Sequence, residues 1–239
     1  MNIHLPWITA LKWQFRSTLE SRRNKYRMRH SPDRGKVFCI GLNKTGTTSW
    51  TLAMKNLGYV VGSETKATMY FDDWARGDFH RIIEYCRHEG EAFQDIPFSL
   101  PATFREMDRA FPGSKFVLTI RESPEQWYRS IIRFHSKSCS ASGNVPPTLT
   151  DLLSATYWRK GFLAEYCRKV LGTPADDPYD RQIVLDFYRT YNQGVQDYFA
   201  GRPDSLLVIN VAKNGEHNRL TRFLGVPPGS DDFPWENKT

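Results

Sequence analysis

The sequence contains no long hydrophobic run. A helix needs roughly 20 apolar residues to span a bilayer, and the most apolar N-terminal stretch, from Ile3 to Trp13, is interrupted by His4, Pro6 and Lys12. The sequence therefore predicts no transmembrane helix. At most, we expect a weak contact between the N-terminal segment and a membrane surface.

Cysteine is also scarce. The four cysteines are Cys39, Cys86, Cys139 and Cys167, and no two of them form a Cys-x-x-Cys motif. A disulfide framework is therefore not indicated, and we expect a reduced, cytoplasmic protein. No group of histidines and cysteines has the spacing of a metal site, so we expect no bound metal.

Acidic residues are outnumbered by basic ones. The 239 residues include 26 Asp and Glu against 33 Lys and Arg, which gives a formal net charge of +7. This charge favours anionic ligands without choosing among nucleotides, nucleic acids and sulfated or phosphorylated substrates. The length, with 40% hydrophobic residues, suits one sizeable domain with a single core.

Basic residues are concentrated near the N-terminus. Residues 1–35 are compatible with a helix and end at the breaker Ser31-Pro32-Asp33-Arg34-Gly35. We predict a basic helical arm outside the core over residues 1–35 and a folded domain over residues 36–239. A solvated helix explains the arginines better than a patch for membranes or nucleic acid, and no nucleic-acid partner is expected.

From residue 36 onwards, short apolar runs alternate with helical patterns. The expected strands cover residues 36–41, 91–96, 115–120 and 206–211. The helix after the first strand carries Trp50, Ala53, Met54 and Leu57 on one face and ends near Gly58. Further helices are expected over 72–88, 100–111, 151–170, 178–200 and 216–224, with another opened by Ser123-Pro124-Glu125-Gln126, a loop over 136–150 and an irregular tail over 227–239. Strands that are almost entirely apolar indicate an α/β fold, in which helices cover both faces of a mainly parallel sheet.

The most informative segment joins the first strand to its helix and reads Gly41-Leu42-Asn43-Lys44-Thr45-Gly46-Thr47-Thr48. The start of a helix offers unpaired N–H groups and the positive end of a dipole, so this loop is typical of a phosphate site. A nucleoside triphosphate loop has Lys after its second Gly, but here Thr47 follows Gly46 and the lysine is Lys44. That displacement favours a shorter anionic group, such as a 5'-phosphosulfate.

Asn43-Lys44-Thr45-Gly46-Thr47-Thr48-Ser49 resembles the 5'-phosphosulfate loop of the sulfotransferases that use 3'-phosphoadenosine 5'-phosphosulfate (PAPS), which typically reads Pro-Lys-Ser-Gly-Thr-Thr. The resemblance implies a three-layer, P-loop-like fold, and it implies that Lys44, Thr45, Gly46, Thr47 and Thr48 bind the cofactor. The frequent Pro of that loop is replaced by Asn43.

A second motif of the family is an Arg at the end of a strand, followed by a Ser on the next helix, with both holding the 3'-phosphate. Arg121 and Ser130 match this motif, with a spacing of nine positions instead of the usual eight. The pair is expected to select PAPS over ATP, because ATP has no 3'-phosphate.

Asp95 in Phe93-Gln94-Asp95-Ile96-Pro97 lies at the end of an expected strand and resembles the Asp-x-Pro motif of one branch of the family. A carboxylate there is suited to act as general base for an acceptor hydroxyl. The alternatives are that Asp95 caps a helix starting near Ser99, or that His135 is the base.

The likeness continues through Arg222-Phe223-Leu224-Gly225-Val226-Pro227 to Phe233-Pro234-Trp235, and so covers about residues 36–239. It implies in-line transfer of a sulfuryl group from PAPS to a small-molecule or carbohydrate acceptor, with adenosine 3',5'-bisphosphate as product. A kinase of a small metabolite and a basic module that binds nucleic acid or membranes are the alternatives.

Overall fold

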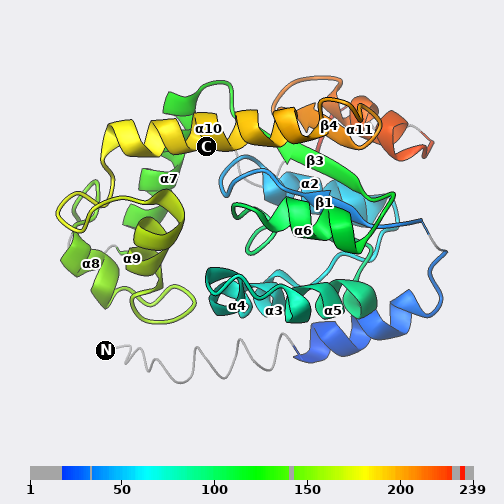
Figure 1. The fold of residues 1–239 in the computed structure, drawn as a ribbon, viewed down its shortest axis with the longest axis horizontal. Helices are drawn as coiled ribbons and strands as arrows, with labels where there is room; N and C mark the ends of the chain where they lie inside the picture. Colours follow the sequence, from blue (N-terminus) through cyan, green and yellow to red (C-terminus); the bar gives the residue numbers. More distant parts are fainter. Residues whose placement is uncertain (1–17, 33, 140–142, 228–231, 235–239) are drawn as a thin grey trace. The chain divides into compact units, whose positions relative to one another are not determined.

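The computed structural model describes residues 18–32, 34–139, 143–227 and 232–234, and Figure 1 shows their elements. These residues divide into two compact units. The sheet unit contains the described residues from 18 to 121 and from 192 onwards, and the helical unit contains those from 122 to 191. This division differs from the expectation of a single core.

The sheet unit is built on four parallel strands: β1 (Val37–Cys39), β2 (Ala92–Phe93), β3 (Lys115–Thr119) and β4 (Leu206–Ile209). Their order is β2-β1-β3-β4, and Phe38 of β1 is in register with Phe93 on one side and Phe116 on the other. All four lie within the predicted strands. The prediction of an α/β fold with a central parallel sheet flanked by helices is confirmed.

Successive side chains of β1 point to opposite faces of the sheet. Val37 and Cys39 belong to a buried cluster with Trp50 of α2 (Thr47–Asn56) and Leu220 of α11 (Glu216–Leu224). Phe38 points to the opposite face, where it meets a second set of aromatic rings, from Phe93, Phe98, Phe111 and Phe116. The sheet is therefore covered on both faces, which gives the layers expected from strands that are almost entirely apolar.

Four helices lie between β1 and β3 in the chain besides α2. They are α3 (Glu64–Thr68), α4 (Phe71–Ala75), α5 (His80–Glu89) and α6 (Thr103–Ala110). The prediction of one helix over 72–88 is wrong, because the chain turns at Gly77, whose φ of 72° is left-handed. Such a residue ends a helix at little cost when it is glycine.

Residues 18–28 form a helix that packs on the sheet unit (Figure 1). Its buried Asn24 donates from Nδ2 to the carbonyl oxygens of Val61, at 2.8 Å, and Glu89, at 3.1 Å. Ser21 is buried beside it. These contacts differ from the expectation of an arm outside the core, and they hold for the described part of the segment. The boundary at residue 36 stays a prediction.

The helical unit starts with α7 (Pro124–Ser138), which begins as predicted: Ser123 is the N-cap and its hydroxyl accepts from the Gln126 N–H at 3.1 Å. The predicted helix over 151–170 is instead α8 (Leu149–Ser154), α9 (Phe162–Tyr166) and a π-helix, η1 (Cys167–Leu171). Gly161, with a φ of 74°, separates α8 from α9. The long helix α10 (Arg181–Phe199) confirms the prediction over 178–200, and its last residues belong to the sheet unit.

Most of the predicted tail over 227–239 lies outside the described residues. Within the part of the chain that the structure describes, no helix is both long enough and apolar enough to cross a membrane.

Candidate functional site

Polar residues of the sheet unit follow the carboxyl ends of all four strands. Residues 40–46 connect β1 to α2, Asp95 comes two residues after β2, Arg121 two after β3, and Asn210 directly after β4. Since the four strands are parallel, these positions share one edge of the sheet, which is where open α/β folds bind their ligands.

Hydrogen bonds fix the loop between β1 and α2 to its neighbours. The Thr45 hydroxyl lies 2.6 Å from the carbonyl oxygen of Leu42 and 2.6 Å from the hydroxyl of Thr119, at the end of β3. The Arg121 Nε donates to the carbonyl oxygen of Lys44 at 2.6 Å. The buried pair of Thr45 and Thr119 therefore fixes the loop to the end of β3, and the guanidinium of Arg121 fixes it to the segment that follows β3.

Two glycines allow this loop to approach the adjacent strands. A Cβ atom on Gly41 would lie 2.0 Å from Oγ1 of Thr119 and 2.4 Å from its carbonyl oxygen. A Cβ on Gly46 would lie 2.2 Å from Cγ2 of Val211, and the φ of Gly46 is 106°. Any side chain at either position would push the loop away from β3 or β4, so both glycines are needed for the observed geometry.

The start of α2 has the features of an anion-binding site. Its N-cap is Gly46, which supplies no side chain to cap the first turn, and no acidic residue lies in that turn. The N–H groups of a first helical turn have no partners within the helix, and the helix dipole adds positive potential there. Thr48 is exposed and Thr47 is buried. Lys44, just before the turn, adds a cation, and its backbone is left-handed, with a φ of 70°.

Asp95 is part-buried, and its carboxylate is held by two donors. Oδ1 accepts from the Ile96 N–H at 2.8 Å and from the Nδ2 of Asn43. Burial raises the pKa of the Asp95 carboxyl above its ordinary value, and the hydrogen bonds from Ile96 and Asn43 and the charge of Lys44 counter only part of that rise in pKa. The φ of Asp95 is 63°, a conformation that Asp tolerates better than most residues.

The structure thus places seven of the eight sequence-predicted site residues in the sheet unit. They are Lys44, Thr45, Gly46, Thr47, Thr48, Asp95 and Arg121. The buried hydroxyl of Thr45 serves the loop itself. Ser130 lies in the middle of α7 in the helical unit, so its pairing with Arg121 stays a prediction.

His135, the alternative base, belongs to the interior of the helical unit. It is buried, its Nδ1 lies 2.6 Å from the hydroxyl oxygen of Tyr179, and its ring packs edge-on against Tyr166 and Tyr179. These contacts give it a structural role. Sequence reasoning did not identify Thr119 or the interaction of Asn43 with Asp95, because a threonine inside a strand and an amide inside a loop carry no distinctive local pattern.

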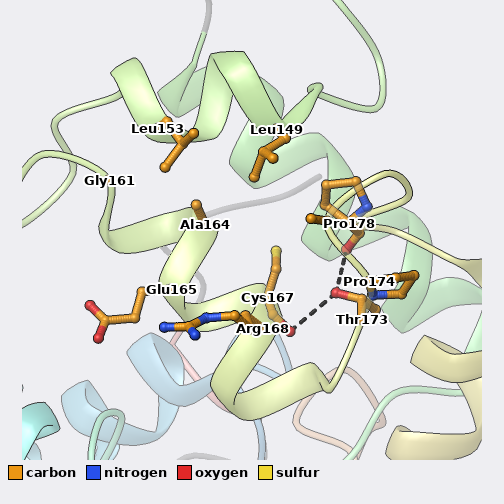
Figure 2. A pocket seen from close by; sticks show the side chains of 11 residues that line it. Leu149, Leu153, Gly161, Ala164, Glu165, Cys167, Arg168, Thr173, Pro174 and Pro178 are labelled. Carbon is orange, nitrogen blue, oxygen red and sulfur yellow. Dashed lines mark hydrogen bonds between the residues drawn. The ribbon is translucent and has the colours of Figure 1, made fainter.

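The helical unit has a pocket of its own, with a volume of about 320 Å³ (Figure 2). Its walls are mostly apolar, and Leu149, Leu153, Ala164 and Pro178 contribute to them. The Thr173 hydroxyl in its wall lies within hydrogen-bond distance of the carbonyl oxygens of Cys167 and Pro178, at 3.1 and 3.0 Å. None of the site residues predicted from the sequence lines this pocket.

No group of three or more His, Cys, Asp or Glu is arranged to hold a metal ion within the described ranges. Comparison with protein families gives one finding: a family model described as "Sulfotransferase domain" matches residues 36–239. That match includes all four strands and the whole loop between β1 and α2. No curated protein matches the chain.

Proposed function

The chain belongs to the sulfotransferase family, and on that basis we propose that it transfers a sulfuryl group from PAPS to an acceptor hydroxyl or amine. The observation that carries the proposal is the loop between β1 and α2, where Lys44 and an uncapped helix start lie beside Asp95 at one edge of the sheet. This arrangement combines a site for an anion with a candidate general base.

The loop suits the 5'-phosphosulfate end of the donor. In the proposed complex, the N–H groups of Gly46 and Thr47 and the hydroxyl of Thr48 hold the 5'-phosphate, while Lys44 interacts with the oxygen that bridges phosphorus and sulfur. Arg121 and Ser130 are proposed to hold the 3'-phosphate. The Nε of Arg121 already donates a hydrogen bond to the backbone of the loop. In the proposed complex, Arg121 would therefore connect the two proposed phosphate sites.

The proposed reaction is an in-line displacement at sulfur. Asp95 accepts the proton of the acceptor group, and the acceptor oxygen or nitrogen forms a bond to sulfur. As that bond forms, the bond from sulfur to the bridging oxygen breaks, and its electron pair stays on the oxygen of the departing adenosine 3',5'-bisphosphate. Lys44 stabilises the negative charge that develops on that oxygen.

The first test is the thermal stability of the full chain with adenosine 3',5'-bisphosphate, with adenosine 5'-monophosphate, and with ATP and Mg²⁺. A ligand at 100 times its dissociation constant stabilises a protein by about 2.7 kcal/mol, which is several degrees in melting temperature. We expect the bisphosphate to bind best. Lys44→Met should weaken its binding by about 10- to 100-fold, the value of a charge-assisted hydrogen bond.

Lys55→Met is the matched control, because Lys55 is an exposed lysine at the opposite end of α2. Ser130→Ala tests the 3'-phosphate site: it should weaken the bisphosphate without changing the binding of the monophosphate. Stabilisation by ATP and Mg²⁺ with none from the bisphosphate would refute the proposal and favour a kinase.

The proposed acceptor is a small molecule or a carbohydrate. We also propose a cytoplasmic location, because all four cysteines are free in the structure, as expected in a reducing compartment. A weak contact of the N-terminal segment with membranes stays a prediction.

A further inference from the structure

The side chain of Asn43 connects the phosphate-binding loop to the segment after β2. Its Nδ2 donates to Oδ1 of Asp95, and its Oδ1 accepts from the hydroxyl of Ser99 at 3.2 Å. Ser99 is fully buried, and its N–H donates to the backbone oxygen of Asp95 at 2.9 Å. A hydroxyl, an amide and a carboxylate thus form one chain of hydrogen bonds.

Chemistry fixes the direction of this chain. A carboxylate only accepts hydrogen bonds, so the NH₂ end of the Asn43 amide must face Asp95. The carbonyl end then faces Ser99, whose hydroxyl is able to donate. Every group in the chain therefore has a partner of the right kind, and the amide cannot be reversed without placing its oxygen against the carboxylate.

The two carboxylate oxygens of Asp95 have different surroundings. Oδ1 accepts from the Asn43 side chain and from the Ile96 N–H, whereas Oδ2 makes no hydrogen bond with the described residues. A carboxylate with no such contacts rotates easily, because the torsion next to it is broad. Two donors on the same oxygen fix that torsion and distinguish the two oxygens.

We propose that Asn43 is a positioning residue for Asp95, so that the chain Ser99–Asn43–Asp95 occupies Oδ1 and presents Oδ2 to the proton of the acceptor. This inference rests on the proposed role of Asp95 as general base. It assigns a function to the position where the resembling family loops frequently have proline, which has no side-chain donor.

The pKa of Asp95 depends on few neighbouring groups. Lys44 is the charged residue that lowers the pKa of Asp95, while burial raises that pKa. Cys39 of β1 is uncharged at neutral pH, because burial raises the pKa of its thiol to about 12. Asn43 and Ser99 carry no charge. Loss of the Asn43 donor should therefore appear directly as a higher pKa for Asp95.

The experiment is a pH titration of Asp95 by NMR, with ¹³C-labelled aspartate and with Asp95→Asn used to assign the signal. The binding of adenosine 3',5'-bisphosphate is measured on the same samples. In Asn43→Leu, whose side chain has the same branched shape and no donor, we expect the Asp95 pKa to rise by about one unit. Ser99→Ala should shift it in the same direction by less, because Asn43 then loses its own anchor.

Gln94→Leu is the matched control, since Gln94 precedes Asp95 but directs its amide to Glu64, at 2.9 Å. It should leave the Asp95 pKa unchanged. An unchanged Asp95 pKa in both Asn43→Leu and Ser99→Ala would overturn the inference; if Asn43→Leu does not fold, Ser99→Ala alone decides. Failure of the wild-type chain to bind the bisphosphate would instead count against the proposed function, so the two failures are distinguishable.

Discussion

At the scale of single residues, unusual backbone conformations coincide with the proposed chemistry. Three non-glycine residues in the described part of the chain have positive φ: Lys44, Asp95 and Ala102. Such conformations cost on the order of 1–3 kcal/mol each and persist where surrounding contacts enforce them. Arg121 contacts the Lys44 backbone, and Ser99 contacts that of Asp95. Two of the three residues are thus the proposed catalytic pair, each held by a specific neighbour.

Asp95→Asn is expected to separate activity from stability. The asparagine is able to adopt the same backbone conformation and still accept hydrogen bonds from Ile96 and Asn43, but it cannot take a proton, so transfer should fall by about 10²- to 10⁴-fold. Because folding raises the pKa of Asp95, the folded state binds its proton more tightly than the unfolded state. The charged carboxylate therefore lowers the free energy of unfolding at pH values above that pKa.

The melting temperature of Asp95→Asn relative to wild type should accordingly increase as the pH rises from 4 to 8. Thermal unfolding over that pH range checks the sign. A variant that becomes progressively less stable than wild type towards pH 8 would show that the ionised carboxylate stabilises the fold, contrary to this account.

The residues of the site were only partly predictable from the sequence. Lys44, Gly46 and Asp95 follow apolar runs, at strand ends where ligands bind, and each also matches a motif of the family, so position and resemblance together identified them. Thr119 and the partnership of Asn43 with Asp95 depend on which strands are adjacent. The order of the strands in the sheet, β2-β1-β3-β4, determines which strands are adjacent. No local sequence pattern specifies that order.

At the scale of elements, the prediction succeeded where hydrophobic periodicity was strong and failed where glycines interrupt it. The helix α11 matches its predicted range, 216–224, because its cap residues and its apolar residues indicate the same bounds. The predicted helices over 72–88 and 151–170 are each divided at a left-handed glycine, Gly77 or Gly161. The helix over 18–28 was predicted to be solvated because arginines dominate its sequence, whereas Asn24 and Ser21 form its buried contacts.

Asn24→Ala should therefore destabilise the chain although it lies in a basic helix. The substitution leaves the carbonyl oxygens of Val61 and Glu89 without their side-chain donor, at a cost of about 1–3 kcal/mol. Urea unfolding measures the difference. Arg23→Ala, an exposed position on the same helix, should change the free energy of unfolding by less than about 0.5 kcal/mol; equal effects of the two variants would show that the helix does not depend on Asn24.

At the scale of the whole molecule, each of the two compact units contains two of the four cysteines. Cys39 and Cys86 lie in the sheet unit, and Cys139 and Cys167 lie in the helical unit. Burial raises the pKa of all four thiols, to about 12 for Cys39 and Cys167. The sequence predicted unpaired cysteines, and it predicted the burial of Cys39 within an apolar strand, but no prediction was made for the burial of Cys86, Cys139 or Cys167.

The native protein at pH 8 should therefore react only slowly with an aromatic disulfide reagent, since the thiolate is the nucleophile and the fold suppresses it. Cys139 is expected to react first, because it is 7% exposed and follows the last residue of α7, whereas Cys39 and Cys86 are 0% exposed. Mass spectrometry of labelled peptides gives the order, and urea should release all four thiols. Early labelling of Cys39 without urea would mean that the β1 region opens locally, and a rigid loop between β1 and α2 would then be untenable.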